Sequence, residues 1–312
     1  MTEAERKQII ALVQREVVPA IGCTEPIAVA LCVAKATETL GAKPEKIDVL
    51  LSANILKNAM GVGIPGTGMI GLPIAIALGA LIGKSEYQLE VLKDSNPAAV
   101  DEGKRFIAEK RINISLKENI SEKLYIEVCC ESGENKATAI IAGGHTTFIY
   151  IARNGGILFS RQNASSEETK EQTVDLTLRK VYDFAMDAPL DEIRFILETA
   201  RLNKAAAESS FDKNYGHGLG RMLRGTYEHK ILGDSVFSHI LSYTSGACDA
   251  RMAGAMIPVM SNSGSGNQGI SATLPVLVYA EENGKSEEEL IRALMLSHLT
   301  VIYLSLIHIS EP

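Results

Sequence analysis

The sequence has no tryptophan, and aromatic residues make up only 5% of its 312 residues. It therefore lacks the interleaved aromatic side chains on which nucleic-acid bases stack. Its formal net charge of −7 is also unfavourable for binding nucleic acid or an anionic membrane surface. We expect no nucleic acid and no membrane as partners, and a small-molecule substrate instead.

Long apolar runs and export signals are lacking as well. The longest apolar stretch, at 69–82, carries no charge and is shorter than the roughly 20 residues that cross a bilayer. Residues 1–14 are charged and have no signal-peptide apolar core. The five cysteines, an odd number, are scattered along the chain, which is typical of a reducing compartment. These features predict a cytoplasmic protein.

Several catalytic and cofactor motifs are also missing. The sequence contains no Cys-x-x-Cys or His-Glu-x-x-His zinc spacing and no Gly-x-Ser-x-Gly nucleophile elbow. Gly61, Gly63 and Gly66 match the dinucleotide fingerprint formally, but that fingerprint requires a strand immediately before it. The strand expected at 46–51 ends earlier, and Pro65 removes a backbone donor from the loop. The sequence therefore disfavours NAD binding.

The pattern of apolar residues predicts an α+β fold. Helical spacing indicates helices at 2–18, 24–40 and 96–110, and alternation at 111–160 indicates an antiparallel sheet of about four strands. After a polar linker at 163–171 the pattern is helical again.

The predicted architecture is a mainly helical domain with an inserted small α/β domain that carries the sheet. Residues 1–85 and 166–304 would form the helical domain, and residues 86–165 the insertion. Residues 305–312 look like a non-native tail, so we expect a C-terminally truncated chain.

The pentapeptide Gly-Cys-Thr-Glu-Pro at 22–26 directly precedes a long apolar helical pattern. Thr24 is a favourable N-cap, and Glu25 and Pro26 suit a first helical turn. The positive end of the helix dipole would stabilise a thiolate at Cys23. Such a thiolate could serve as a nucleophile or as a ligand for iron. The alternative is a small buried apolar residue.

Two glycine-rich loops each precede an apolar helix. In the first, at 54–68, backbone N–H groups could bind a substrate carboxylate, with Lys57 and Asn58 as side-chain donors, or the loop could be a tight packing turn. The second, at 260–269, consists mainly of small and polar residues that cannot pack a core, which favours ligand binding. The candidate substrate-binding residues in the second loop are Ser261, Asn262, Ser263, Gly264, Ser265, Gly266 and Asn267.

Two further side chains are candidates for chemistry. His145 lies in a Gly-Gly-His bend between two expected strands, where an imidazole is placed to act as acid or base. Arg251 lies upstream of the second loop and could clamp a carboxylate through two hydrogen bonds, although a structural pair with Asp249 is equally compatible with the pattern.

Taken in order, the motif at 22–26, the loop at 54–68, Gly144-His145-Thr146 and the loop at 261–269 resemble the L-cysteine desulfidase family. That family is related to the α-chain of bacterial iron–sulfur L-serine dehydratases. The resemblance covers the chain up to about residue 303. It implies a [4Fe-4S]-dependent β-elimination that converts L-cysteine to pyruvate, ammonia and sulfide in the cytoplasm.

The resemblance also implies roles for individual residues. Cys23 matches the N-terminal cysteine thought to ligate the cluster, and the loop at 261–269 matches the substrate loop of the dehydratases. His145 is our candidate for the base that removes the α-proton. The family's further ligand cysteines lie in a C-terminal helical segment that this chain does not match, so we expect the remaining cluster ligands to be absent from it.

Other interpretations remain open at this stage. L-Serine differs from L-cysteine in one leaving atom and would suit the same mechanism. A non-catalytic amino-acid-binding protein or an inactive fragment would use the same loops without elimination. A pyridoxal-phosphate lyase would need a Schiff-base lysine beside a phosphate cup, and Lys57 is the candidate near a glycine loop. The oligomeric state is not determined, and a homodimer is compatible with the sequence.

Overall fold

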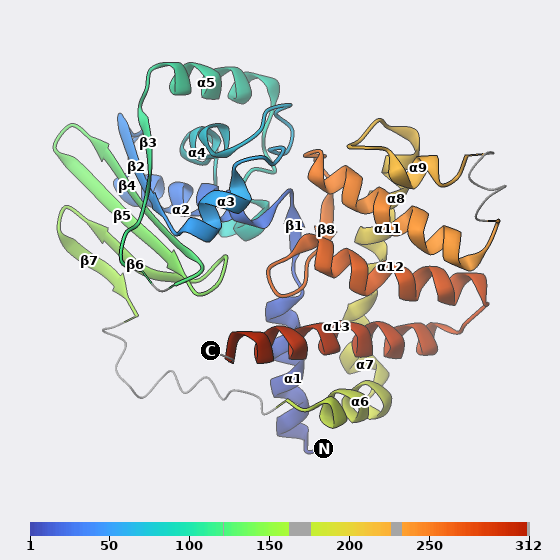
Figure 1. Cartoon of the computed structure of the whole chain (residues 1–312). Coiled ribbons are helices and arrows are strands. Elements are labelled where there is room, and N and C mark those ends of the chain that lie inside the picture. Colours follow the sequence, from blue (N-terminus) through green and yellow to red (C-terminus); the bar gives the residue numbers. More distant parts are fainter. Residues whose placement is uncertain (121, 162–175, 226–232, 311–312) are drawn as a thin grey trace. The chain divides into compact units, whose positions relative to one another are not determined.

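The computed structural model describes residues 1–120, 122–161, 176–225 and 233–310 (Figure 1). It forms two compact units. A sheet unit comprises Ile21–Thr169 and Ala253–Met256, and a helical unit comprises Met1–Ala20, Lys170–Met252 and Ile257–Pro312. The α+β class expected from the sequence is confirmed. The linker expected at 163–171 lies outside the described residues.

The sheet unit is built on a six-stranded mixed sheet (Figure 1). Its spatial order is β3 (Ile112–Leu116), β2 (Lys46–Leu51), β4 (Tyr125–Ser132), β5 (Asn135–Ala142), β6 (Phe148–Arg153) and β7 (Gly156–Ser160). The sequence predicted an antiparallel sheet of about four strands at 111–160, whereas β2 lies between β3 and β4 and pairs in parallel with β3. Alternation cannot reveal this, because it fixes which face a residue occupies and not the direction of the neighbouring strand.

Helices cover one face of this sheet. Helix α2 (Thr24–Leu40) packs against β4 and β5, α4 (Leu72–Leu81) packs against α2, and α5 (Pro97–Ala108) packs against α4 (Figure 1). Gly79 permits the close approach of α4 to α2, since a Cβ there would lie 2.6 Å from the Ala30 carbonyl oxygen. Two short elements complete this region, α3 (Ala53–Ala59) and the 3₁₀ helix η1 (Ser85–Glu90).

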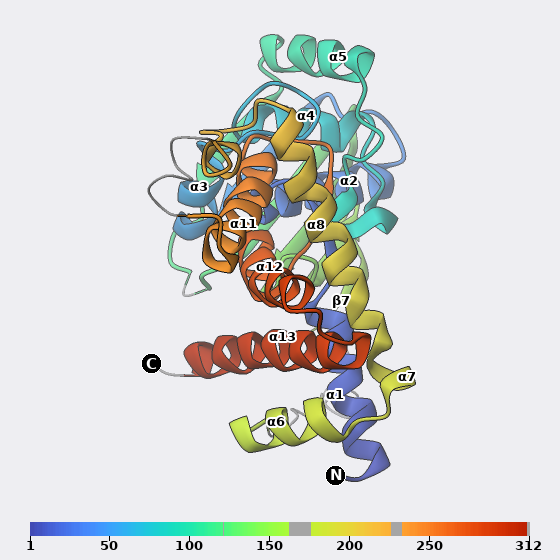
Figure 2. The same ribbon diagram turned by 90° about the vertical axis from the view of Figure 1, so that its right-hand side faces the viewer.

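The helical unit packs several amphipathic helices around one apolar core. Helices α8 (Leu197–Asp212), α11 (Val236–Met252) and α12 (Gly266–Glu282) lie side by side, and α13 (Glu287–Ser310) packs against α12 and α6 (Leu178–Asp187) (Figure 2). Phe184, Leu274 and Leu294 are among the buried core residues. The remaining elements are α1 (Glu3–Glu16), α7 (Leu190–Ile193), η2 (Arg194–Ile196), α9 (Leu219–Met222) and the two-stranded pair of β1 (Pro19–Ile21) and β8 (Pro258–Met260).

Helix α13 contains a stretch that passes the length and composition test for a membrane span. The stretch is Glu287–Leu306, and 33% of its 18-residue apolar segment is buried within the protein. Ile291, Leu294 and Leu299 of this helix belong to the apolar core of the helical unit. These residues pack one part of α13 against that core.

The division into units differs from the one expected from the sequence. Residues 1–85 were expected to pack with the C-terminal helices, but only Met1–Ala20 does so. The long helix α2 is buried around nearly its whole circumference, between the sheet on one side and α4 on the other. When a helix is apolar on all sides, its sequence does not indicate which element it packs against.

Candidate functional site

Cys23 begins helix α2. The sequence placed the N-cap at Thr24, but the N-cap is Cys23, with extended backbone angles, and Thr24 is the first helical residue. The shift brings the sulfur one residue nearer to the unpaired N–H groups of the first turn. Cys23 is 8% exposed, so its thiol lies at the edge of the core and not on an open surface.

The Glu25 carboxylate receives several donors next to this thiol. The Cys23 Sγ donates to Glu25 Oε2 at 3.1 Å, and the Thr24 hydroxyl donates to the same oxygen at 3.1 Å. The other oxygen, Oε1, accepts from Asn58 Nδ2 at 3.4 Å. From the sequence, Glu25 was predicted only to suit the first turn of a helix. An acidic residue two positions after a cysteine at a helix start was the available signal.

Several interactions favour the charged form of Glu25. Burial opposes its ionisation, but the Cys23 thiol, the Glu25 backbone N–H, the nearby charge of His145 and the Thr24 hydroxyl together hold the pKa of Glu25 below its ordinary value. His145 lies in the turn between β5 and β6, half-buried and within electrostatic reach of Glu25. The structure therefore brings Cys23, Glu25, Asn58 and His145 together in the sheet unit. We call this group the Cys23 cluster.

Lys57 is not part of this cluster. It is exposed on α3, whose Asn58 reaches Glu25. A Schiff-base lysine is generally desolvated in an apolar pocket or set beside another cation, and the exposure of Lys57 does not match that environment.

The first glycine loop is a tight packing turn. The backbone N–H groups of Ile64, Gly66 and Thr67 donate to main-chain carbonyls at 2.9–3.2 Å, and that of Met69 donates to the Thr67 hydroxyl at 3.0 Å. These donors are therefore not available to an anion. The loop follows α3 and not β2, so it also lacks the strand–loop–helix order of a dinucleotide site.

This loop instead supports the cysteine motif. Gly22 has a φ of +81°, and a Cβ at that position would lie 2.4 Å from Cγ of Pro65. Position 22 therefore requires glycine for two reasons. Its backbone is left-handed, and the loop lies too close to leave room for a side chain.

We expect Gly22→Ala to lower the free energy of unfolding by about 2 kcal/mol, because it adds left-handed strain to a steric clash. Urea denaturation measures this loss. Gly61→Ala is the matched control in the same loop, since a Cβ there meets nothing within 4 Å. Equal stability of the two variants would contradict the assigned role of Gly22.

The second loop is more ordered than its composition suggested. Ser261 and Asn262 are fully buried, and the Ser261 hydroxyl donates to the Val18 carbonyl at 2.7 Å. Helix α12 begins at Gly266 with Ser265 as its N-cap, so Gly266 and Asn267 belong to its first turn and not to the loop. Ser263 and Gly264 have left-handed φ angles of 47° and 78°.

This geometry leaves donors at the start of α12. Among the described residues, no acceptor receives the backbone N–H of Gly264, Gly266 or Asn267. Arg251 is 4% exposed, and its Nη1 donates to Asn267 Oδ1 at 2.9 Å. A Cβ on Gly266 would lie 2.2 Å from Arg251 Nε. The helix start and the guanidinium are therefore in direct contact and together suit a carboxylate.

His298 was not predicted as a site residue, because in the sequence it shows only a helical pattern. It is fully buried on α13, and burial lowers its pKa to about 4. Its ring nitrogens lie 3.0 Å from Asn262 Nδ2 and 3.0 Å from the Thr273 hydroxyl. A histidine inside a helical pattern gives no indication of a buried polar partner, so tertiary structure was needed to find it.

The other four cysteines do not suit a metal site. Burial raises the pKa of the thiols of Cys32, Cys129, Cys130 and Cys248, to about 12 for Cys130. Cys32 donates to the Ala139 carbonyl at 3.3 Å and thereby packs α2 on the sheet.

A [4Fe-4S] cluster is usually held by four Cys thiolates. Within the described residues, no three His, Cys, Asp or Glu side chains gather to hold a metal ion. The part of the chain that the structure describes thus offers Cys23 as one suited thiol and does not by itself fit a cluster.

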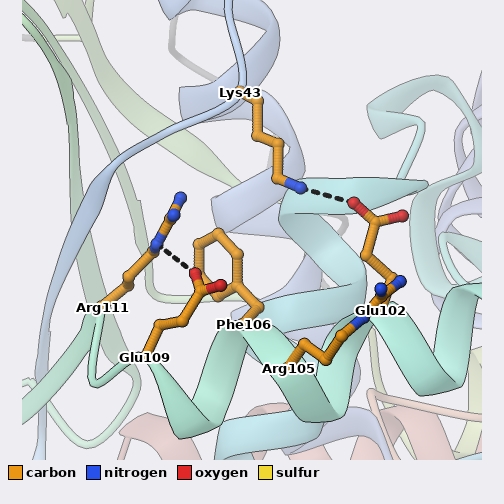
Figure 3. Close-up of a pocket in the computed structure, with 6 residues that line it drawn as sticks. All are labelled: Lys43, Glu102, Arg105, Phe106, Glu109 and Arg111. Atoms are coloured by element: carbon orange, nitrogen blue, oxygen red, sulfur yellow. Dashed lines mark hydrogen bonds and ion pairs between the residues drawn. The ribbon is translucent and has the colours of Figure 1, made fainter.

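A small pocket of about 240 Å³ lies at the end of α5 and is lined by none of the residues predicted for the site (Figure 3). Two ion pairs lie in its lining: Lys43 contacts Glu102, and Arg111 Nε lies 2.6 Å from Glu109 Oε2. Phe106 lies among these pairs. The two ion pairs tie Lys43 and Arg111 to the C-terminal part of α5, and Arg105 lines the pocket beside them.

Comparisons with known proteins agree with the resemblance found in the sequence. A family model described as serine dehydratase alpha chain matches residues 86–307. A UPF0597 protein of Bacteroides fragilis is 83% identical over 304 residues, which is 97% of this chain and 71% of the relative. UPF0597 proteins of Bacteroides thetaiotaomicron and Porphyromonas gingivalis are 78% and 49% identical, covering 97% of this chain and 71% and 72% of the relatives.

The chain therefore belongs to the serine dehydratase alpha-chain family. This relation supports a lyase that acts in amino-acid catabolism.

Proposed function

We propose that this protein is a cytoplasmic β-eliminating lyase that converts L-cysteine and water to pyruvate, ammonia and sulfide. The observation that carries the proposal is the Cys23 cluster, in which a thiol at a helix start donates to Glu25 at 3.1 Å with His145 in electrostatic reach. A thiol, a carboxylate and an imidazole held together are groups suited to proton transfer and to binding a soft metal.

The roles proposed for the residues follow from their chemistry. In the sheet unit, His145 removes the α-proton of the amino acid, and Glu25 holds the imidazole and the Cys23 thiol in place. In the helical unit, the N–H groups of Gly264, Gly266 and Asn267, with the positive charge of Arg251, suit a carboxylate.

The iron–sulfur cofactor of the family remains part of the proposal. Cys23 is the residue that we propose as its ligand, and the described residues do not by themselves supply the other ligands of a cluster.

The L-serine dehydratase reaction is the second candidate. The family description of the matching model favours it, since that description names serine. A serine lyase needs the same α-proton base and the same carboxylate site and differs in the leaving group, hydroxyl in place of thiol. The described residues do not distinguish the two leaving groups.

An activity assay separates these candidates. Protein prepared anaerobically with iron and sulfide is given L-cysteine or L-serine, and pyruvate and newly released sulfide are measured. We expect pyruvate and sulfide in equal amounts from L-cysteine and a much slower reaction with L-serine. Pyruvate from L-serine alone would establish the dehydratase.

Two further outcomes would contradict lyase activity of the proposed kind. Binding of either amino acid without pyruvate formation would establish a non-catalytic binding protein. Activity that requires added pyridoxal phosphate, with a visible aldimine band lost in Lys57→Ala, would replace the Cys23 cluster with a Schiff-base lysine.

A further inference from the structure

A buried polar network connects α8, α12 and α13 to the second loop. Its four side chains, Asn203, Asn262, Thr273 and His298, are each fully buried. Asn203 Nδ2 donates to the Thr273 hydroxyl at 2.9 Å, and Asn203 Oδ1 accepts from the Met260 N–H at 2.8 Å. Each member of such a network must be satisfied, because an unpaired polar group at these positions is costly.

The hydrogen bonds assign the protonation state of His298. The Thr273 hydroxyl donates to the Gly269 carbonyl at 2.7 Å, so its oxygen accepts a proton from His298 Nε2 at 3.0 Å. The Nδ1 nitrogen then has a free lone pair, which accepts from Asn262 Nδ2 at 3.0 Å. The ring is therefore neutral and carries its proton on Nε2.

His298 holds Asn262 through two bonds. Besides the contact with Nδ1, Asn262 Nδ2 donates to the His298 carbonyl oxygen at 3.0 Å. The Asn262 main chain in turn closes the turn, exchanging N–H···O bonds of 3.1 and 3.0 Å with Ser265. Its side-chain oxygen accepts from the Ser263 hydroxyl at 2.8 Å, next to the left-handed Ser263 and Gly264.

We propose that His298 is a positioning residue for binding of a carboxylate at the start of α12 in the helical unit. Through Asn262 it fixes the strained turn at 262–265, and that turn directs the N–H groups of Gly264, Gly266 and Asn267 towards one anion. Asn262 acts in the same way and does not contact the substrate. It is fully buried, and both its amide nitrogen and its amide oxygen are already hydrogen-bonded within the network. The inference rests on the proposed function and names the residues that shape its carboxylate site.

Two substitutions separate the roles of the two ring nitrogens. In His298→Asn, the side-chain amide oxygen takes the place of Nδ1 and still accepts from Asn262. In His298→Gln, the longer side chain places its amide near Nε2, so Thr273 keeps a partner, and Asn262 loses its side-chain acceptor and keeps only the main-chain carbonyl at position 298. Thr273→Val is the matched control for loss of network stability, since it removes the contacts of Thr273 with Nε2 and with Asn203 and keeps both acceptors of Asn262 on His298.

The experiment measures KM and kcat for L-cysteine and L-serine, the exchange rates of the Asn262 and Ser265 amides, and the global stability of all three variants. We expect His298→Gln to raise KM about tenfold, as for loss of one buried hydrogen bond, with kcat little changed. Its two amides should exchange about tenfold faster after correction for global stability. His298→Asn and Thr273→Val should keep KM and the corrected exchange rates of the wild type.

Equal changes in all three variants, in proportion to their lost stability, would overturn the proposal and leave the network a general structural one. No change in the His298→Gln variant would overturn it as well. If the wild-type protein forms no pyruvate from either amino acid, the proposed function fails, and the exchange rates still decide whether His298 positions the turn.

Discussion

Replacing Cys23 with serine is expected to lower kcat/KM for the amino-acid substrate by more than about 100-fold. Residues that only hold a metal ligand in place already cost up to about 100-fold when they are replaced, and Cys23 is the proposed ligand itself. Serine is the informative substitution at this position. It is a good N-cap for α2, and its hydroxyl can still donate to Glu25 in place of the thiol. The fold and the hydrogen bond are thus retained, and only the sulfur is lost.

Cys129→Ser is the matched control for Cys23→Ser. Cys129 is a half-buried thiol on β4 whose pKa is raised by burial, and it is not a member of the Cys23 cluster. We expect its kcat/KM to stay within about twofold of the wild type, as for most substitutions away from a site. A Cys23→Ser variant as active as Cys129→Ser would show that the sulfur of Cys23 has no part in the reaction.

The stability of the protein is expected to fall by about 3 kcal/mol between pH 7 and pH 4 because of His298 alone. Burial lowers the pKa of His298 from 6.5 to about 4. The unfolded chain therefore binds one more proton than the folded chain between these values. The stabilisation is fully present above pH 6.5 and is lost as the pH falls towards 4.

Urea denaturation at several pH values tests this prediction against His298→Asn, which has no titrating ring. Other groups titrate in both proteins, so the difference between their free energies of unfolding isolates His298. The wild type should lose up to about 1.4 kcal/mol more per pH unit than the variant in this window. Parallel pH profiles would show that His298 is not held neutral in the folded state.

Much of the sheet unit could be predicted from the sequence, because its signals are local. The alternation in β4 and β5 and the Asn96 cap of α5 are properties of adjacent residues. The motif around Cys23 could be recognised for the same reason, because its cysteine, its capping residue and its acidic residue are consecutive in the sequence. The N-cap itself was wrong by one residue, which is within the usual uncertainty of helix ends.

Features that depend on distant segments could not be predicted. Glu25 gains its partner Asn58 from α3, and His298 meets Asn262 across 36 positions. The parallel pairing of β2 with β3 and the assignment of α2 to the sheet unit are likewise decided by packing. The polar composition of the second loop indicated a site, but the structure shows that Ser261 and Asn262 use their side chains to shape it.

The most direct test of the account follows sulfide release from L-cysteine by the wild-type protein and by Cys23→Ser in one anaerobic preparation. The account predicts that the wild type forms sulfide and pyruvate in equal amounts over many turnovers and that the variant forms neither above background. Sulfide and pyruvate from the variant at the wild-type rate would contradict it, as would a wild-type protein that binds L-cysteine and releases no sulfide.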